Sequence, residues 1–203
     1  MTDVPADQRS SAVTPPPAPD PAVRLVYGTA AIGDLDGFLA DCDAVAAETG
    51  AVVQAFDAGL VASETHLREA TRLAARSIAR DEAVARDPGV EILLYAAGRR
   101  QIDRAFELGI ETGDCGVVVL LADFGGVPGA GRPAADLDRA VEAIAPLVAE
   151  ESADEAASAG GTGPVDEERV REFYGISDRE LDATDADLSD VVRERAALLD
   201  VEK

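Results

Sequence analysis

Lysine, histidine and cysteine are nearly missing from this sequence of 203 residues, which has one lysine, one histidine and two cysteines. The 18 basic residues face 40 acidic ones, and the formal net charge is -22. General binding to duplex DNA or to membrane surfaces depends on basic surface, which so acidic a chain lacks. The composition therefore excludes both of these broad classes.

Long apolar runs are also missing. No segment approaches the roughly 20 apolar residues that a membrane-spanning helix needs, and the first residues, MTDVPADQRSS, lack the apolar stretch of a secretory signal. The two cysteines, Cys42 and Cys115, stand far apart without CxxC or CxxH context. We expect a cytoplasmic protein with reduced thiols and no membrane partner.

Common catalytic motifs are absent as well. There is no HExxH, no GxSxG and no cluster of cysteines and histidines, so no motif in the sequence supports a hydrolase or a metal enzyme. Gly126 and Gly131 match the glycines of a phosphate-binding loop, GxxxxGK[ST]. However, Arg132 and Pro133 stand where the loop requires a lysine and a hydroxyl. We expect no catalytic residue, metal or cofactor, with a small nucleotide-binding enzyme that uses loop 125–131 as the alternative.

What the sequence does contain is enough apolar residues, 47%, to form a core. Short apolar runs predict strands, and apolar residues at helical spacing predict helices between them. This alternation predicts an α/β (α+β) single domain, with a mixed sheet of about four strands flanked by helices and a C-terminal helical extension. The predicted strands cover 24–27, 52–56, 90–97 and 116–122, and the predicted helices cover 34–49, 63–80, 100–108, 136–148, 166–174 and 185–199.

Two segments interrupt this pattern. Residues 1–22 contain TPPPAPDP and predict a disordered tail. Residues 151–164 are low in complexity and acidic, which predicts a flexible linker. We therefore divide the chain into a tail, a core domain (23–150), a linker, and C-terminal helices (165–203) that belong to the same domain.

The charge excess has a particular form. All basic residues except Lys203 are arginines, and aspartate outnumbers glutamate. This pattern resembles cytosolic proteins of halophilic archaea that accumulate salt, in which a charged surface stays hydrated while molar salt screens its self-repulsion. We therefore expect an origin in a halophilic archaeon.

One window departs from the acidic background. Residues 64–104 contain eight arginines against seven acids. Four of these arginines recur every fourth residue on one face of the predicted helix 63–80, opposite its apolar face; they are Arg68, Arg72, Arg76 and Arg80. Such a face is typical of a nucleic-acid or phosphate site. It is also typical of a surface helix with internal salt bridges, and spacing alone favours this second interpretation, because Glu64 and Glu69 stand at pairing distance along the helix.

The single histidine, His66, lies near the start of the same helix, at the border of its predicted apolar face. No serine, cysteine or acid completes a catalytic constellation around it. It is either a structural histidine or part of a binding surface.

Longer blocks of the sequence resemble a known family. LVASETHLREATRLAARSIAR (60–80), EILLYAAGRRQIDRAFELGI (91–110) and GVVVLLA (116–122) resemble the Cgi-family subunit of the KEOPS complex, the family of the PRPK-binding protein (TPRKB). Two blocks near the C-terminus, DEERVREFYGISDRELDAT (166–184) and DLSDVVRERAALLDV (187–201), resemble the family's C-terminal helices. The resemblance extends over about 23–203, apart from the 125–165 region.

This resemblance implies a non-enzymatic subunit. Members of the family bind the kinase-like ATPase of the complex and help to hold tRNA through its 3′ CCA end, while a separate catalytic subunit installs threonylcarbamoyl on adenosine. A pure protein–protein adaptor is a further alternative.

We assign two surfaces on this basis. The expected tRNA surface comprises Arg68, Arg72, Arg76, Arg80, Arg99, Arg100, Gln101, Arg104 and His66. In the last helix an apolar stripe is either core or a docking element for the kinase-like subunit. The expected docking residues are Leu188, Val191, Val192, Arg195, Leu198 and Leu199.

Overall fold

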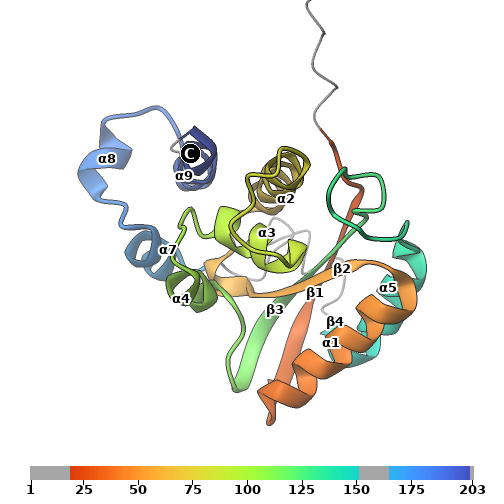
Figure 1. The fold of residues 1–203 in the computed structure, drawn as a ribbon. Helices are drawn as coiled ribbons and strands as arrows, with labels where there is room; N and C mark the ends of the chain where they lie inside the picture. The colour runs from red at the N-terminus through yellow and green to blue at the C-terminus, as the bar shows by residue number, and fades with distance from the viewer. Residues whose placement is uncertain (1–18, 151–164, 202–203) are drawn as a thin grey trace, which may run out of the picture.

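An antiparallel sheet forms the centre of the computed structural model, which describes residues 19–150 and 165–201 (Figure 1). The strand order is β2-β3-β1-β4. Most of the predicted tail and the whole predicted linker lie outside the described residues. The four strands are β1 (Val23–Ile32), β2 (Val52–Asp57), β3 (Gly113–Ala122) and the short β4 (Ala149–Glu150).

The central strand, β3, is buried on both faces. Val117, Val119 and Leu121 point into one apolar core, and the residues between them point into a second core on the opposite face. Because side chains alternate along a strand, a continuous apolar run such as GVVVLLA suits a strand that is covered on both sides. Strand β1 pairs with β3 along all ten of its residues, from Val23 opposite Ala122 to Ile32 opposite Gly113.

Helices cover each face of the sheet (Figure 1). On one face lie α1 (Leu35–Thr49) and α5 (Leu137–Ile144), and on the other lie α2 (Glu64–Ala79) and α3 (Pro88–Ala96). The C-terminal helix α9 (Leu188–Val201) packs on α2 and α3. The remaining helical segments are η1 (Ala58–Leu60), α4 (Ile102–Ala105), η2 (Phe106–Leu108), η3 (Ala145–Leu147), α7 (Glu167–Tyr174) and α8 (Asp178–Asp182).

The helix ends have local causes in the sequence. The Ser63 hydroxyl accepts a hydrogen bond from His66 N, which caps α2 as its position in the sequence predicts. Gly50 ends α1 with a φ of 76°, a left-handed conformation that glycine adopts without a steric cost. Pro146 follows the end of α5, so the predicted helix 136–148 continues only as the 3₁₀ turn η3.

The expected fold class, a single α+β domain, is confirmed, but three details differ. Every described strand pairing is antiparallel, where we expected a mixed sheet. Strand β1 continues through Gly28 to Ile32 because Gly28 pairs opposite Val117 within the ladder. The short helix α8 follows Ser177 and had no predicted counterpart.

The predicted strand 90–97 is wrong, because this segment forms helix α3. The helix is wedged between the sheet and α2, and nearly all of its residues are buried. Its apolar run consequently shows no helical periodicity, and such a run cannot be told from a buried strand by pattern alone. The discriminating signal was Asp87–Pro88: the Asp87 carboxylate accepts from Val90 N, and Pro88 occupies the first turn.

A buried carboxylate fixes the turn between α2 and α3. Glu91 is 1% exposed. Its Oε2 accepts hydrogen bonds from the backbone N–H groups of Val84 and Ala85 at 3.0 and 2.8 Å, and its Oε1 accepts from the Ser77 hydroxyl at 3.0 Å. With these three donors the buried charge is compensated, and the turn is held so that Arg80 and Arg86 face solvent.

Candidate functional site

Three of the four arginines on the predicted α2 stripe form ion pairs with nearby carboxylates. Arg68 contacts Glu64 at 2.5 Å, and it also donates to the Val23 carbonyl at 3.2 Å. Arg72 contacts Glu69 at 2.5 Å, and this hydrogen bond lowers the pKa of Glu69. The third, Arg76, contacts Asp200 of α9 at 2.8 Å. Most of the stripe therefore matches the interpretation of α2 as a surface helix with salt bridges.

The second group of predicted tRNA residues lies at the turn from α3 to α4. Arg99 donates to the Phe173 carbonyl and stands over the Phe173 ring, 5.2 Å from its centroid. Arg100 donates to the Leu199 carbonyl at 3.3 Å, and Gln101 is exposed. Neither Arg99 nor Arg100 forms an ion pair with a carboxylate in the described part of the chain. Neither positive charge is therefore offset by a contacting carboxylate among these residues.

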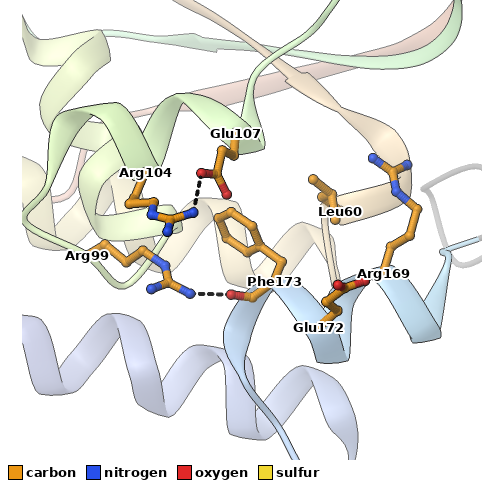
Figure 2. A pocket seen from close by; sticks show the side chains of 7 residues that line it. All are labelled: Leu60, Arg99, Arg104, Glu107, Arg169, Glu172 and Phe173. Carbon is orange, nitrogen blue, oxygen red and sulfur yellow. Dashed lines mark hydrogen bonds and ion pairs between the residues drawn. The ribbon is translucent and has the colours of Figure 1, made fainter.

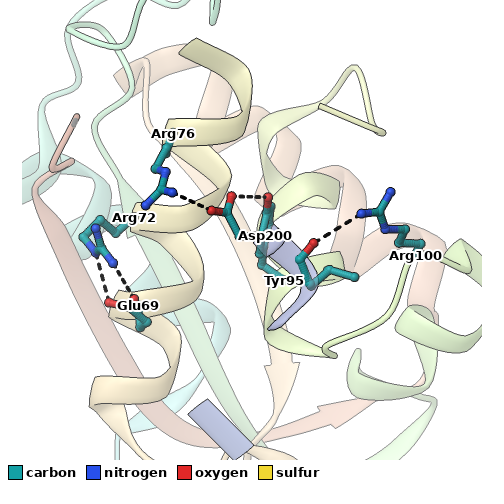
Figure 3. Close-up of polar contacts among 7 residues, drawn as sticks. Glu69, Arg72, Arg76, Tyr95, Arg100 and Asp200 are labelled. Atoms are coloured by element: carbon teal, nitrogen blue, oxygen red, sulfur yellow. Dashed lines mark hydrogen bonds and ion pairs between the residues drawn. The ribbon is translucent and has the colours of Figure 1, made fainter. Parts of the chain in front are cut away.

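Helix α9 separates these two groups of arginines. Figure 3 shows its Asp200 between Arg76 of α2 on one side and Tyr95 of α3 on the other. The carbonyl of the preceding residue, Leu199, accepts from Arg100. The expected single arginine surface is therefore two surfaces with the last turn of α9 between them.

A groove of about 500 Å³ opens beside the α3–α4 turn (Figure 2). Its polar wall is mixed in sign, because Arg104 contacts Glu107 at 2.8 Å and Arg169 contacts Asp57 at 2.7 Å. The groove is lined by Leu60, Arg99, Arg104, Glu107, Arg169, Glu172 and Phe173. Residues from α7 therefore complete a surface whose predicted members all came from 99–104.

His66 is the clearest correction to the expected tRNA surface. Its side chain is fully buried, and its Nε2 lies 2.8 Å from the Ala96 carbonyl. The Tyr174 hydroxyl donates to the same carbonyl at 2.9 Å, and the two rings meet edge to face. Because no solvent-facing atom is left to meet a ligand, His66 is a core residue in this structure.

Three of the six predicted docking residues of α9 are buried in the core. Val191, Val192 and Leu199 are buried, whereas Leu188 is partly exposed. Arg195 forms an ion pair with Glu180 of α8 at 2.7 Å. Leu198 is different, since 43% of it is exposed. It is therefore the apolar side chain of this set that a partner could cover without displacing the core.

Two exposed apolar side chains near the α3–α4 turn were missed. Ile102 is 39% exposed and Phe106 is 54% exposed. They stand four residues apart, so they lie on one side of the short helical segment α4–η2. The signal was present in the sequence as an apolar pair with Arg100 before it and Arg104 inside it, but no role was predicted for the pair.

The glycine-rich loop shows no phosphate-loop geometry. Arg132 donates to the Ala51 carbonyl at 2.8 Å, and the Asp123 carboxylate accepts from Gly125 N and Ala135 N. A Cβ on Gly125 would lie 2.4 Å from the Ala134 Cα, so this glycine serves close backbone packing. The helix that follows begins only at Leu137. These contacts give no support to a nucleotide site at 125–131.

Neither cysteine has the setting of a reactive thiol. Burial raises the pKa of Cys42 to about 12, with Asp43 and Asp41 adding to the effect. Burial also raises the pKa of Cys115. Both thiols are therefore protonated near neutral pH, and a protonated thiol is a poor nucleophile and metal ligand.

Two further observations concern the described residues as a whole. In 19–150 and 165–201, no group of three or more histidine, cysteine or acidic side chains is arranged to hold a metal ion. None of the helices in these ranges has the length and apolar character needed to cross a bilayer.

The fold defines a class, an α+β domain whose antiparallel sheet lies between two helical layers. Within that class, the family model described as "Kinase binding protein CGI-121" matches residues 42–200. The chain therefore belongs to the CGI-121 family of kinase-binding proteins. None of the curated proteins compared with the chain matches it.

Proposed function

We propose that this protein is a non-catalytic subunit of the KEOPS complex, which makes threonylcarbamoyladenosine in tRNA. In this role it binds the kinase-like ATPase subunit, helps to recruit tRNA through the 3′ CCA end, and meets the threonylcarbamoyl transferase subunit only indirectly. The observation that carries the proposal is the family match over 42–200, which covers α2, α3, the α3–α4 turn and most of α9.

We place the tRNA contact at the α3–α4 turn rather than along the whole α2 stripe. Arg99 and Arg100 carry guanidinium groups without a carboxylate partner in the described residues, and Arg104 and Gln101 stand beside them. The exposed Phe106 offers a ring on which a base can stack. Single-stranded ends are recognised by this combination of stacking and bidentate arginine contacts, which survives salt better than attraction to phosphate alone.

A double substitution tests this surface. Arg100→Ala with Arg104→Ala should weaken tRNA binding at high KCl by about tenfold or more, because two base or phosphate contacts are lost. The matched control is Arg24→Ala with Arg139→Ala, which removes two exposed arginines that pair with Asp138 and Glu48. Binding is measured with tRNA that has or lacks the CCA end, and the loss should appear only with the CCA end.

If both double variants bind intact tRNA equally well, the α3–α4 turn is not the tRNA surface. If the unmodified chain does not shift tRNA at all, the protein is a pure protein–protein adaptor, and the tRNA part of the proposal fails.

We place the contact with the kinase-like subunit at the exposed side of α9, centred on Leu198. Leu198→Glu should reduce capture of that subunit by about tenfold or more, since a charge would be buried in an apolar contact. Leu39→Glu on α1 is the matched control, because Leu39 is 42% exposed and Leu198 is 43% exposed. Equal capture by both variants would remove α9 from the interface.

A further inference from the structure

The last turn of α9 holds a carboxylate that is almost completely buried. The Asp200 side chain is 5% exposed, and its Oδ2 lies 2.8 Å from the Arg76 guanidinium. Its Oδ1 accepts a hydrogen bond from the Tyr95 hydroxyl at 3.2 Å (Figure 3). An ion pair that is shielded from water is stronger than one at the surface. Arg76 is therefore held more firmly than the exposed Arg68, which pairs with Glu64.

The same turn holds a second arginine through its backbone. Arg100 donates to the Leu199 carbonyl. The last carbonyls of a helix have no partner within the helix, and the helix dipole makes this end negative, so it attracts a cation. The turn from Leu198 to Val201 thus contacts both Arg76 of α2 and Arg100 of the α3–α4 turn. Both arginines were expected to contact tRNA.

These contacts compete with an incoming phosphate. A phosphate that reaches Arg76 must displace Asp200 or accept repulsion from it. The charge of Asp200 also extends beyond its direct partner: the pKa of Arg72 is raised first by its hydrogen bond to Glu69, and the charges of Asp20 and Asp200 contribute further. The closed turn therefore lowers the affinity of this face for anions.

The attachment of this turn is local. Further back, α9 is anchored in the cores by Val191, Val192 and Ala196, which are buried. The last turn adds the buried Leu199, one ion pair and two hydrogen bonds, and opening it locally costs less free energy than unfolding the whole domain. Leu198, which we propose contacts the kinase-like subunit, belongs to the same turn.

We propose that the last turn of α9 is a latch, which restrains Arg76 and Arg100 in the isolated protein and is released when the kinase-like subunit binds at Leu198. The inference rests on the proposed function. Released from Asp200 and the Leu199 carbonyl, the two arginines face a ligand together with Arg99. Binding of the subunit and binding of tRNA are then coupled, and by linkage each raises the affinity of the other by the same factor.

The test is Asp200→Asn in the full chain, with Asp190→Asn as control. Each removes one negative charge from α9, but Asp190 is exposed and pairs with Arg193 instead. We expect Asp200→Asn to raise the tRNA affinity of the isolated chain by about fivefold or more, and Asp190→Asn by less than about twofold. Tyr95→Phe leaves the net charge unchanged and loosens Asp200, so it should act in the same direction. Circular dichroism verifies folding, and Tyr95→Phe serves as the test if Asp200→Asn does not fold.

The kinase-like subunit provides a second measurement. At saturating concentration it should raise the tRNA affinity of the unmodified chain by about the factor that Asp200→Asn produces, and it should add little to the variant. If the unmodified chain binds tRNA and Asp200→Asn matches Asp190→Asn, the latch is refuted while the proposed function stands. If the unmodified chain and the variants all fail to bind tRNA, the tRNA role itself is refuted.

Discussion

At the scale of single residues, His66 shows how the fold sets a protonation state. Its Nε2 faces the Ala96 carbonyl, an acceptor, so the proton of the neutral ring is assigned to Nε2. Its Nδ1 is buried and has no hydrogen-bond partner among the described residues. Burial lowers the pKa of His66 to about 4, against the opposing effect of the Ala96 hydrogen bond, and the charge of Arg193 lowers it further. The ring is therefore neutral near pH 7.

This depressed pKa makes stability depend on pH in a defined window. The unfolded chain binds a proton at His66 near pH 6.5 and the folded chain near pH 4, so stability is fully present above the upper value and falls as the pH drops through the window. The total loss is about 3 kcal/mol. Subtracting the urea-unfolding free energy of His66→Gln from that of the unmodified chain, between pH 7 and 4, isolates this contribution. A difference that does not change with pH would contradict the assignment.

At the scale of elements, α9 combines two roles on neighbouring residues. Leu199 is 7% exposed and packs into the main core, whereas Leu198 beside it points outward. One side of the helix holds the domain together, and the other is available to a partner. This division explains why the apolar stripe of α9 has the composition of both a core and a docking element.

Alanine substitutions should separate the two roles. Leu199→Ala leaves a cavity and should cost about 2–5 kcal/mol of unfolding free energy, while Leu198→Ala should change it by less than about 0.5 kcal/mol. Denaturant unfolding of the two variants measures the contrast. Equal costs would mean that α9 is not packed on the domain in the way its buried face indicates.

Prediction of the elements succeeded where the signal was local. Ser63 caps α2, Gly50 ends α1, and Pro146 shortens α5, all as expected. It failed for α3, because the sheet and its neighbouring helices surround this helix and erase its periodicity. Local chemistry decides where a helix begins, but a uniformly apolar segment takes its conformation from what packs around it.

At the scale of the whole molecule, the main feature is the excess of acidic over basic residues. Apart from Arg9, which lies outside the described residues, ten of the 16 arginines form ion pairs with described carboxylates. Most of the acidic residues in 19–150 and 165–201 still have no arginine partner within these ranges. Their mutual repulsion opposes the compact state unless salt screens it.

Stability should therefore rise steeply with salt. Raising KCl from 0.05 to 1 M shortens the Debye length from more than 10 Å to about 3 Å. We expect the melting temperature to rise by about 5–10 °C over that range, which corresponds to roughly 2–3 kcal/mol, and then to level off. Differential scanning calorimetry follows the curve. If the melting temperature does not rise below 1 M KCl but rises linearly at molar salt, the stabilisation comes from preferential exclusion of salt instead of charge screening.

The sequence by itself determined the acidic surface, the capped helices, the buried central strand and the similarity to a kinase-binding family, because each depends on composition or on residues close together in the chain. Only the tertiary structure decided that His66 is buried, that α3 is a helix, and that Asp200 stands between Arg76 and Arg100. These outcomes depend on contacts between residues from 30 to more than 100 positions apart, and local periodicity carries no information about such contacts.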